Sequence, residues 1–279
     1  MSIETPPLAP ARRRLPSLSW QYTPSVLLVL ATIAFWEGFI RLRNVPAYLW
    51  PAPSTIARTM RDDGGLLASS TFVTAREVIY GFVIAIVAGL TIGIVIHLSS
   101  ALRRAIYPIL IASQSVPTVV LAPVLVIVMG FGIGPKLVII ALFTFFPIVV
   151  NTVDGLGSVD HDYIRMMLTL DASRWSIFRR VEFPAALPLI FSGIRIGATY
   201  AAIGAIFGEW AGSDAGLGYE MLQAQGRLET PRVFAAVLIV TLIAITLFGL
   251  VSLVERITIP WSRVGKGPQR QPTPRRGPN

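Results

Sequence analysis

Few residues of this chain have the types and spacing that covalent catalysis or metal binding requires. The chain has no cysteine, which excludes a disulfide framework, a thiolate metal site and a cysteine nucleophile, and its only histidines are His97 and His161. The motifs HExxH and GxSxG are missing, and GFGIGPK at residues 130–136 lacks the spacing and the Ser or Thr of a phosphate-binding loop. The sequence therefore predicts no catalytic residue, no metal site and no cofactor, and any ATP is expected to be bound by another chain.

Other polar residues stand inside or at the edge of long apolar runs, where they could line the path of a solute through a membrane. Hydrogen bonds between helices explain the amide and hydroxyl groups around Pro117 at least as well. The stretch GSDAGLG at residues 212–218 is typical either of a re-entrant outer turn or gate or of an ordinary loop. The candidates for a substrate path or gate are Gln114, Ser115, Thr118, Arg195, Tyr200, Glu209 and Trp210.

Of these residues, Arg195 costs the most free energy to place inside a membrane. It lies about 10 residues beyond Pro184, hence roughly 15 Å into a helix and near the centre of a bilayer. An arginine there costs about 2.5–3.5 kcal/mol, so a partner inside the bundle is expected. Glu209 on the same helix is roughly 21 Å away, and helix-end carbonyls, Gln114 or a carboxylate on a neighbouring span are better candidates. A structural clamp, a side chain that snorkels inward and a role in translocation all remain open.

Six apolar runs are long enough to cross a membrane, for which about 20 residues suffice. With 53% hydrophobic and 14% charged residues among 279, and a mean hydropathy of +0.66, the chain is too apolar for an ordinary soluble domain. We therefore predict an all-α membrane protein, with Pro117 and Pro123 bending the third helix. The predicted spans are 22–40, 73–98, 105–129, 135–153, 185–209 and 233–255.

The first span is the weakest of the six. Glu37 interrupts it, and an apolar run after Arg12, Arg13 and Arg14 also resembles a secretory signal. No A-x-A-like cleavage site follows convincingly, so we favour an uncleaved helix. Three parts are expected: a cytoplasmic segment over residues 1–21, a transmembrane domain over residues 22–256, and a basic disordered tail over residues 257–279.

Lys and Arg in the connections predict the orientation of the chain. With both termini in the cytoplasm, fifteen of these residues lie inside and seven outside, which is the bias expected of a multi-pass protein of the cell (plasma or inner) membrane. The net charge of +9 follows from this topology. No aromatic-interleaved basic patch points to nucleic acid, and the lipid bilayer is the expected surrounding.

The amphipathic stretch DASRWSIFRRVEFPAALP, residues 171–188, belongs to the longest cytoplasmic loop, residues 154–184. Residues 161–170 are expected to form a short helix, and Asp171 or Ser173 to cap a second one. Apolar side chains share one face of the second helix and arginines occupy the rest. Pro184 lacks an amide donor, so we expect a bend at Phe183 before the next span. The loop therefore predicts a helix-turn-helix knob, with an amphipathic helix lying on anionic lipid as the alternative.

The segment LTLDASRWSIFRRVEFPAALPLIFSGIRIG, residues 168–197, resembles the cytoplasmic coupling loop of permeases from binding-protein-dependent ABC importers. Residues 114–156 and 208–222 are similar to the branch of that family that handles nitrate, sulfonates, taurine and pyrimidine or thiamine precursors. The resemblance spans about residues 70–256 and implies the type I permease fold. It also implies three kinds of partner: ABC ATPase subunits, an extracytoplasmic solute-binding protein that selects the solute, and a second permease copy in a homodimer.

In that family the loop docks into a groove of the ATPase subunit. An apolar face would provide the anchor and arginines would orient it against acidic groove residues. The chain departs from the family pattern at Arg165, Met166 and Met167 in place of Glu-Ala-Ala, at Asp171 in place of glycine, and at Phe183 in place of leucine. Asp tolerates a left-handed backbone, so the turn can survive. The residues that the resemblance assigns to ATPase coupling are Asp171, Ala172, Ser173, Arg174, Trp175, Phe178, Arg179, Pro184 and Pro188.

Two other functions fit part of the pattern. A secondary transporter also uses helices rich in Gly and Pro with scattered polar groups, but the sequence shows no inverted repeat and only one cytoplasmic knob. An intramembrane enzyme would depend on Glu209 alone, because the spans contain no paired aspartates at midplane depth. Copurification with an ATPase subunit distinguishes an importer permease from both.

Overall fold

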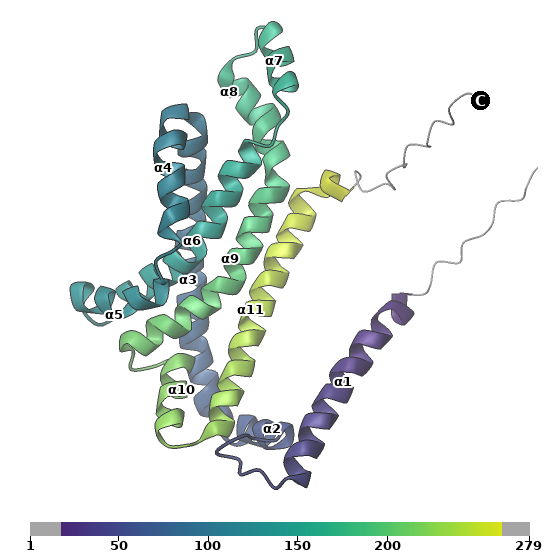
Figure 1. The fold of residues 1–279 in the computed structure, drawn as a ribbon, viewed down its shortest axis with the longest axis vertical. Coiled ribbons are helices and arrows are strands. Elements are labelled where there is room, and N and C mark those ends of the chain that lie inside the picture. Colours follow the sequence, from purple (N-terminus) through teal and green to yellow (C-terminus); the bar gives the residue numbers. More distant parts are fainter. Residues whose placement is uncertain (1–17, 264–279) are drawn as a thin grey trace, which may run out of the picture.

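The computed structural model describes residues 18–263, and every regular element in that range is helical (Figure 1). The predictions for residues 1–17 and 264–279 lie outside the described residues. Four long helices match predicted spans and extend beyond them by a few residues to one turn or more. They are α3 (Gly64–Leu98), α6 (Ile133–Leu156), α9 (Phe183–Gly212) and α11 (Thr230–Thr258).

The first span is also helical, as α1 (Leu18–Leu42), and most of it lies apart from the bundle, which it contacts near its C-terminal end where the Trp36 ring packs against Phe234 (Figure 1). The short helix α2 (Pro53–Asp62) connects it to α3. Glu37, the charge that interrupts this span, accepts hydrogen bonds from the Ser54 amide at 3.0 Å and the Ser54 hydroxyl at 2.7 Å, and it pairs with Arg41. The carboxylate therefore joins the end of α1 to the start of α2.

Helix α6 packs tightly against α3 on one side and α9 on the other. The close approach needs glycine: a Cβ atom on Gly81 would lie 2.5 Å from Ile140 Cγ2, and one on Gly193 would lie 2.6 Å from the Pro147 carbonyl oxygen. Glycines at these positions let neighbouring backbones approach closely, as is common between membrane helices. Helices α3, α6 and α9 thus form the core, which includes buried Val78, Ile148 and Ile190.

The third predicted span is not a single helix. It consists of α4 (Ser100–Ser113) and α5 (Thr118–Met129), whose axes differ by 96°, so the described residues contain five candidate spans, or six if this bent pair is one. Pro117 cannot donate a backbone hydrogen bond and has an extended conformation at the start of α5, which ends the helical path. Pro123 remains inside α5. The prediction that Pro117 only bends the helix was therefore wrong.

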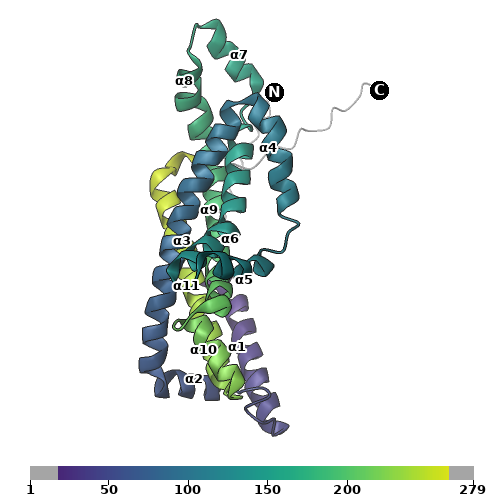
Figure 2. The same cartoon turned by 90° about the vertical axis from the view of Figure 1, so that its left-hand side faces the viewer.

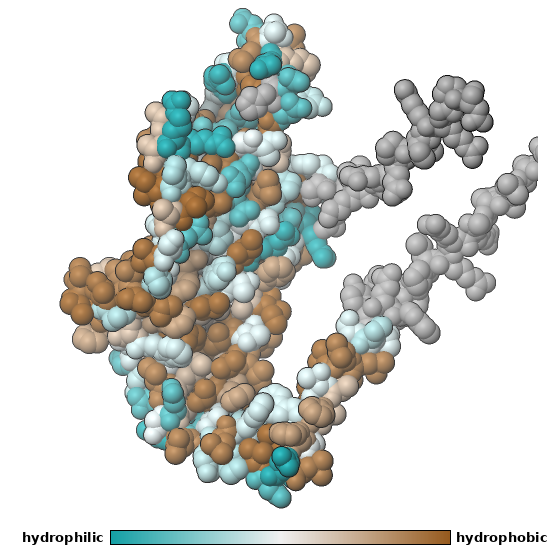
Figure 3. All heavy atoms as spheres, viewed as in Figure 1, coloured by the Kyte–Doolittle hydropathy of each residue, from teal (hydrophilic) through white to brown (hydrophobic). Residues whose placement is uncertain are grey.

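Two ends of the molecule can be distinguished. Short helices α7 (His161–Thr169) and α8 (Arg174–Ile177) project at one end, beyond the level at which α11 ends (Figures 1 and 2). Helices α2 and α10 (Leu217–Gly226) lie at or toward the opposite end. Brown apolar side chains cover much of α1, α5 and the middle of the bundle, whereas teal residues gather around α7 and α8 (Figure 3). This distribution is expected of helices that contact lipid between two polar ends.

Candidate functional site

The projecting segment from α7 to α8, which we call the knob (residues 157–182), is built by local capping. The Asp160 side chain accepts a hydrogen bond from the Asp162 amide at 2.9 Å at the start of α7, and the Ser173 hydroxyl accepts one from the Ser176 amide at 3.2 Å at the start of α8. Asp171 between them has φ = +57°, a left-handed conformation that aspartate adopts more readily than most residues. The predicted short helix, turn and Ser173 cap are confirmed.

One aromatic side chain of the knob is exposed and is supported by a buried one. Trp175 is 63% exposed and its ring stacks on that of Phe178, with centroids 5.4 Å apart. Phe178 is only 7% exposed and packs in turn against Phe183. Exposed Arg174 and Arg179 lie beside them. The two aromatics predicted as one anchor therefore have different roles, because Trp175 offers a free surface and Phe178 belongs to the core.

The chain does not bend at Phe183, contrary to the prediction. The helix continues from α8 through a π-helical turn (Phe178–Glu182) into α9, so that one helical path runs from Arg174 to Gly212. Pro184 lies in the first turn of α9, and the Phe183 amide donates to the Phe178 carbonyl five residues back. Because Pro184 has no amide hydrogen, one α-helical hydrogen bond is missing here, and the wider π-helical turn absorbs this loss without a break in the helix. Pro188 is likewise inside α9.

The π-helical turn is attached to α3 by a polar contact that the sequence analysis missed. His97 Nε2, in the last turn of α3, lies 3.1 Å from a carboxylate oxygen of Glu182, and both side chains are nearly buried. Within residues 18–263 the second ring nitrogen, Nδ1, has no hydrogen-bond partner. The knob is therefore connected to α3 as well as to α9.

Three of the predicted path residues line one cavity of about 440 Å³: Gln114, Thr118 and Tyr200. The break between α4 and α5 supplies the first two, α9 supplies Tyr200, and α6 supplies most of the other lining residues, Asn151 among them. Ser115 is exposed and is not among the lining residues. The broken helix therefore brings together polar groups that are 86 positions apart in the sequence at most.

Arg195 does not line this cavity, because it forms an ion pair with Glu255. Glu255 lies three residues before the end of α11, so the pair joins α9 to α11 on the side of the molecule that carries the knob (Figure 1). The expectation of a carboxylate on a neighbouring span is confirmed. Arg195 lies in the middle part of α9 (Phe183–Gly212), and its position near the centre of the bilayer stays a prediction.

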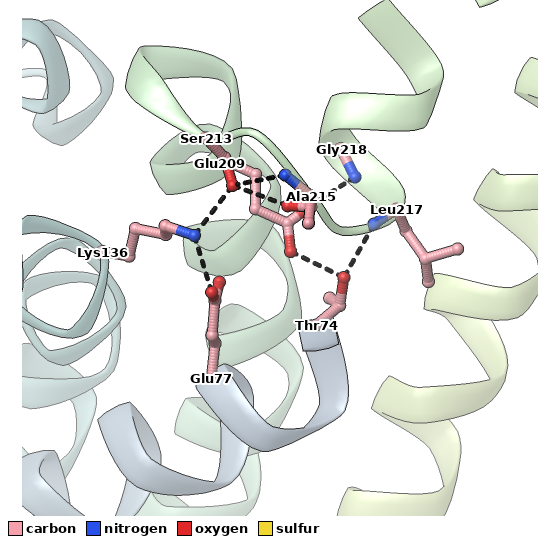
Figure 4. A network of polar contacts seen from close by, with 8 residues as sticks. All are labelled: Thr74, Glu77, Lys136, Glu209, Ser213, Ala215, Leu217 and Gly218. Atoms are coloured by element: carbon pink, nitrogen blue, oxygen red, sulfur yellow. Dashed lines mark hydrogen bonds and ion pairs between the residues drawn. The ribbon is translucent and has the colours of Figure 1, made fainter. Parts of the chain in front are cut away.

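Glu209 and Trp210 organise the turn of residues 213–216 between α9 and α10. Buried Glu209 accepts hydrogen bonds from the Thr74 hydroxyl at 2.6 Å and the Gly218 amide at 2.5 Å (Figure 4). The Trp210 indole donates to the Gly218 carbonyl oxygen at 3.0 Å. Gly216 has φ = +112°, and a Cβ atom there would lie 2.3 Å from the Glu209 carboxylate. The turn therefore requires glycine at position 216, and the hydrogen bonds of Glu209 and Trp210 hold it in place.

A second buried group of charges, absent from the sequence analysis, adjoins this turn. The Lys136 ammonium donates to Glu77 at 2.7 Å and to the Ser213 hydroxyl at 2.8 Å, and the Ser213 hydroxyl donates to the Ala215 carbonyl oxygen at 2.6 Å (Figure 4). The sequence did contain a signal for this pair, because an acid and a base within or beside apolar helices cost free energy unless they have a partner. Among the described residues no group of three or more His, Cys, Asp or Glu could hold a metal ion.

Comparisons with known proteins agree with this architecture. Residues 81–259 match the family described as binding-protein-dependent transport system inner membrane component. The chain is 35% identical to the formylaminopyrimidine transport permease protein ThiX of Halalkalibacterium halodurans, over 88% of this chain and 98% of the relative. It is 33% identical to the riboflavin transport system permease protein RibX of Chloroflexus aurantiacus, over 91% and 96%.

A solved structure gives independent support for the fold. An inward-facing conformation of the MetNI methionine ABC transporter superposes with a TM-score of 0.55 at 19% identity, covering 68% of this chain and 96% of the other. The identity is low, so this likeness concerns the fold alone. The family match over residues 81–259 and the 35% identity to a permease over 88% of the chain show that the chain belongs to the family of binding-protein-dependent transport system inner membrane components, as the permease subunit of an ABC transporter whose ATPase is a separate subunit.

Proposed function

We propose that this permease carries a small organic solute, either a pyrimidine or thiamine precursor or a sulfonate, or else nitrate, into the cell. The similar permeases of known name transport formylaminopyrimidine and riboflavin, and others at 29% and 26% identity are named for aliphatic sulfonates and nitrate. The observation that carries the proposal is the cavity shared by Gln114, Thr118 and Tyr200 beside a broken helix, since discontinuous membrane helices commonly form substrate sites.

The knob is the proposed docking element for the ATPase subunit. Trp175 supplies an exposed aromatic anchor, and Arg174 and Arg179 flank it with positive charge. Interfaces take most of their affinity from a few buried aromatic and arginine residues, so this composition suits a groove with an acidic rim. Because the knob continues into α9 without a break, a movement of Trp175 would be transmitted directly to Tyr200.

A second copy of the permease is the proposed partner within the membrane. Tyr200 is 42% exposed although it lines the cavity, so this chain does not enclose the cavity by itself. A homodimer would place two such cavities on a common axis and close them against each other. An extracytoplasmic binding protein would deliver the solute at the end opposite the knob, where α2 and α10 lie (Figure 1).

Both termini and the knob are proposed to face the cytoplasm. The fifteen-to-seven excess of Lys and Arg supports this orientation. Cysteine-free wild type permits a direct test, with a Cys at exposed Asp214 and a matched one at exposed Thr169 of the knob. A membrane-impermeant thiol reagent should label Asp214→Cys in intact cells and Thr169→Cys only after the cells are opened. The reverse pattern would show the opposite orientation.

A secondary transporter that works without an ATPase is the competing function, and one purification separates the two. The tagged permease, expressed with the products of its neighbouring genes, should retain an ATPase subunit through detergent extraction and should import solute into proteoliposomes only when ATP is supplied. Uptake driven by an ion gradient, with no associated ATPase, would reject the proposal.

A further inference from the structure

The chemical character of the cavity at the break between α4 and α5 restricts the class of solute that it can bind. Among the described residues, those that line it include no Asp, Glu, His, Lys or Arg. Its polar groups are neutral: the amides of Gln114 and Asn151 and the hydroxyls of Thr118 and Tyr200. Its volume of about 440 Å³ lies within the usual range of small-molecule sites, about 300–1,000 Å³.

The apolar part of the wall includes two aromatic rings, those of Phe143 and Phe146, each of which is held by a neighbouring ring. Phe143 stacks nearly parallel on Phe207, with centroids 5.9 Å apart and planes 7° apart. Phe146 meets Phe145 edge to face, with centroids 5.5 Å apart. Rings that are already packed lose little freedom when a flat ligand stacks on them, which favours binding of planar π systems.

The amide groups fit such a ligand. Asn and Gln side chains present a donor and an acceptor together, the pattern that pairs with the ring nitrogen and amino group of a heterocycle. The Asn151 amide nitrogen donates to the Pro147 carbonyl oxygen at 2.8 Å, which fixes the orientation of that side chain. The cavity therefore offers rings that can stack on the faces of a planar ligand and amides that can form hydrogen bonds with its edges.

The same cavity offers an anion few positive groups that could compensate for the loss of its hydration. The wall includes the N-terminus of α5 at Thr118, where a helix dipole supplies about half an elementary charge. Pores that pass anions generally line their path with Arg or Lys. Arg195, one residue from the lining residue Ile196, is paired with Glu255 and is not part of the wall.

We infer that this cavity is a transit site for neutral, planar heteroaromatic solutes of the pyrimidine class and that it does not accept sulfonates or nitrate. The inference rests on the proposed function, because it assigns a cargo class to the same cavity. It concerns the membrane subunit itself, independently of the solute-binding protein that delivers the cargo.

The test uses single cysteines in this cysteine-free chain, within the permease–ATPase complex. Thr118→Cys places a thiol in the cavity wall, and Ser115→Cys places a matched thiol three residues away that does not line it. Labelling by N-ethylmaleimide is followed by mass spectrometry of the permease in the presence of 4-aminopyrimidine, ethanesulfonate or nitrate. We expect 4-aminopyrimidine alone to slow labelling several-fold at Thr118→Cys, with no change at Ser115→Cys.

Equal protection by ethanesulfonate or nitrate would overturn the inference, and so would protection by none of the three probes. ATP hydrolysis and ATPase copurification, measured on the same sample, report on the proposed function separately. A sample that hydrolyses ATP but is protected by anions would reject only the cargo class. A sample without any associated ATPase would reject the proposed function while the labelling result still decides the cavity chemistry.

Discussion

The ammonium nitrogen of Lys136 lies 2.7 Å from a carboxylate oxygen of Glu77, and both side chains are buried. These residues belong to α6 and α3, and Lys136 also reaches Ser213 in the turn that follows α9. One ammonium group therefore joins three parts of the bundle, in the half of the molecule away from the knob (Figure 1). Within residues 18–263 the other oxygen of Glu77 has no hydrogen-bond partner, so the pair is not fully satisfied.

Removing one member of this pair should cost more than removing both. Lys136→Met leaves the Glu77 carboxylate buried without a counter-charge, and breaking a buried pair in this way typically costs about 3–5 kcal/mol. The double variant Glu77→Gln/Lys136→Met removes both charges of the pair and should recover much of the lost stability. Thermal unfolding of the detergent-solubilised protein measures both, and a double variant as unstable as Lys136→Met would show that the ion pair is not the source of the effect.

The two aromatic residues of the knob should respond differently to substitution. Trp175→Ala removes an exposed ring and should leave the melting temperature nearly unchanged while the ATPase subunit is lost on purification. Phe178→Ala removes a buried ring and should destabilise the permease by about 3–5 kcal/mol.

Trp50→Ala is the matched control for that comparison, since Trp50 is also exposed but lies before α2, at the end opposite the knob. It should retain the ATPase. If Trp175→Ala and Trp50→Ala retain the ATPase equally well, Trp175 is not an anchor for that subunit.

Pro184 is expected to set the rotation of the knob relative to α9. The π-helical turn contains one residue more than an α-helical turn, which is equivalent to about 100° of rotation. Pro184→Ala restores an amide donor and favours a regular α-helix, so it should raise or preserve thermal stability. The same change should turn Trp175 away from the ATPase subunit. We expect normal folding and weaker coupling of ATP hydrolysis to uptake, measured in proteoliposomes. Unchanged coupling would mean that the π-helical turn persists without the proline or has no role.

Sequence patterns predicted the elements whose causes are local. Four spans follow directly from apolar run length, and the Ser173 cap and the left-handed Asp171 follow from the preferences of those residue types. The break at residues 114–117 and the continuous helix through Pro184 were both predicted wrongly, although each involves a proline. A proline can end a helix, bend it or be absorbed by a π-helical turn, and the surrounding packing selects among these outcomes.

The site was predictable only where a polar residue was conspicuous by itself. Gln114, Thr118 and Tyr200 were identified as polar groups in apolar runs, but their meeting in one cavity depends on the angle between α4 and α5. The Glu77–Lys136 and His97–Glu182 contacts join residues 59 and 85 positions apart. Spacing along one helix contains no information on such pairs, since they arise from how the helices pack.

The ion pair between Arg195 and Glu255 provides the last prediction, because it distinguishes a structural clamp from a role in transport. Both side chains are partly buried, and the contact joins the middle of α9 to the last turn of α11. A clamp predicts that Arg195→Met lowers thermal stability and that adding Glu255→Gln restores part of it, because the unpaired carboxylate is then gone. Arg195→Lys should retain more stability than Arg195→Met, although lysine lacks the planar fork of arginine. A role in transport predicts instead that Arg195→Met assembles with the ATPase and hydrolyses ATP normally while uptake falls and partly recovers in Arg195→Lys. Melting temperature, ATPase activity and uptake measured on the wild type and these three variants separate the two, and normal values of all three in Arg195→Met would reject both.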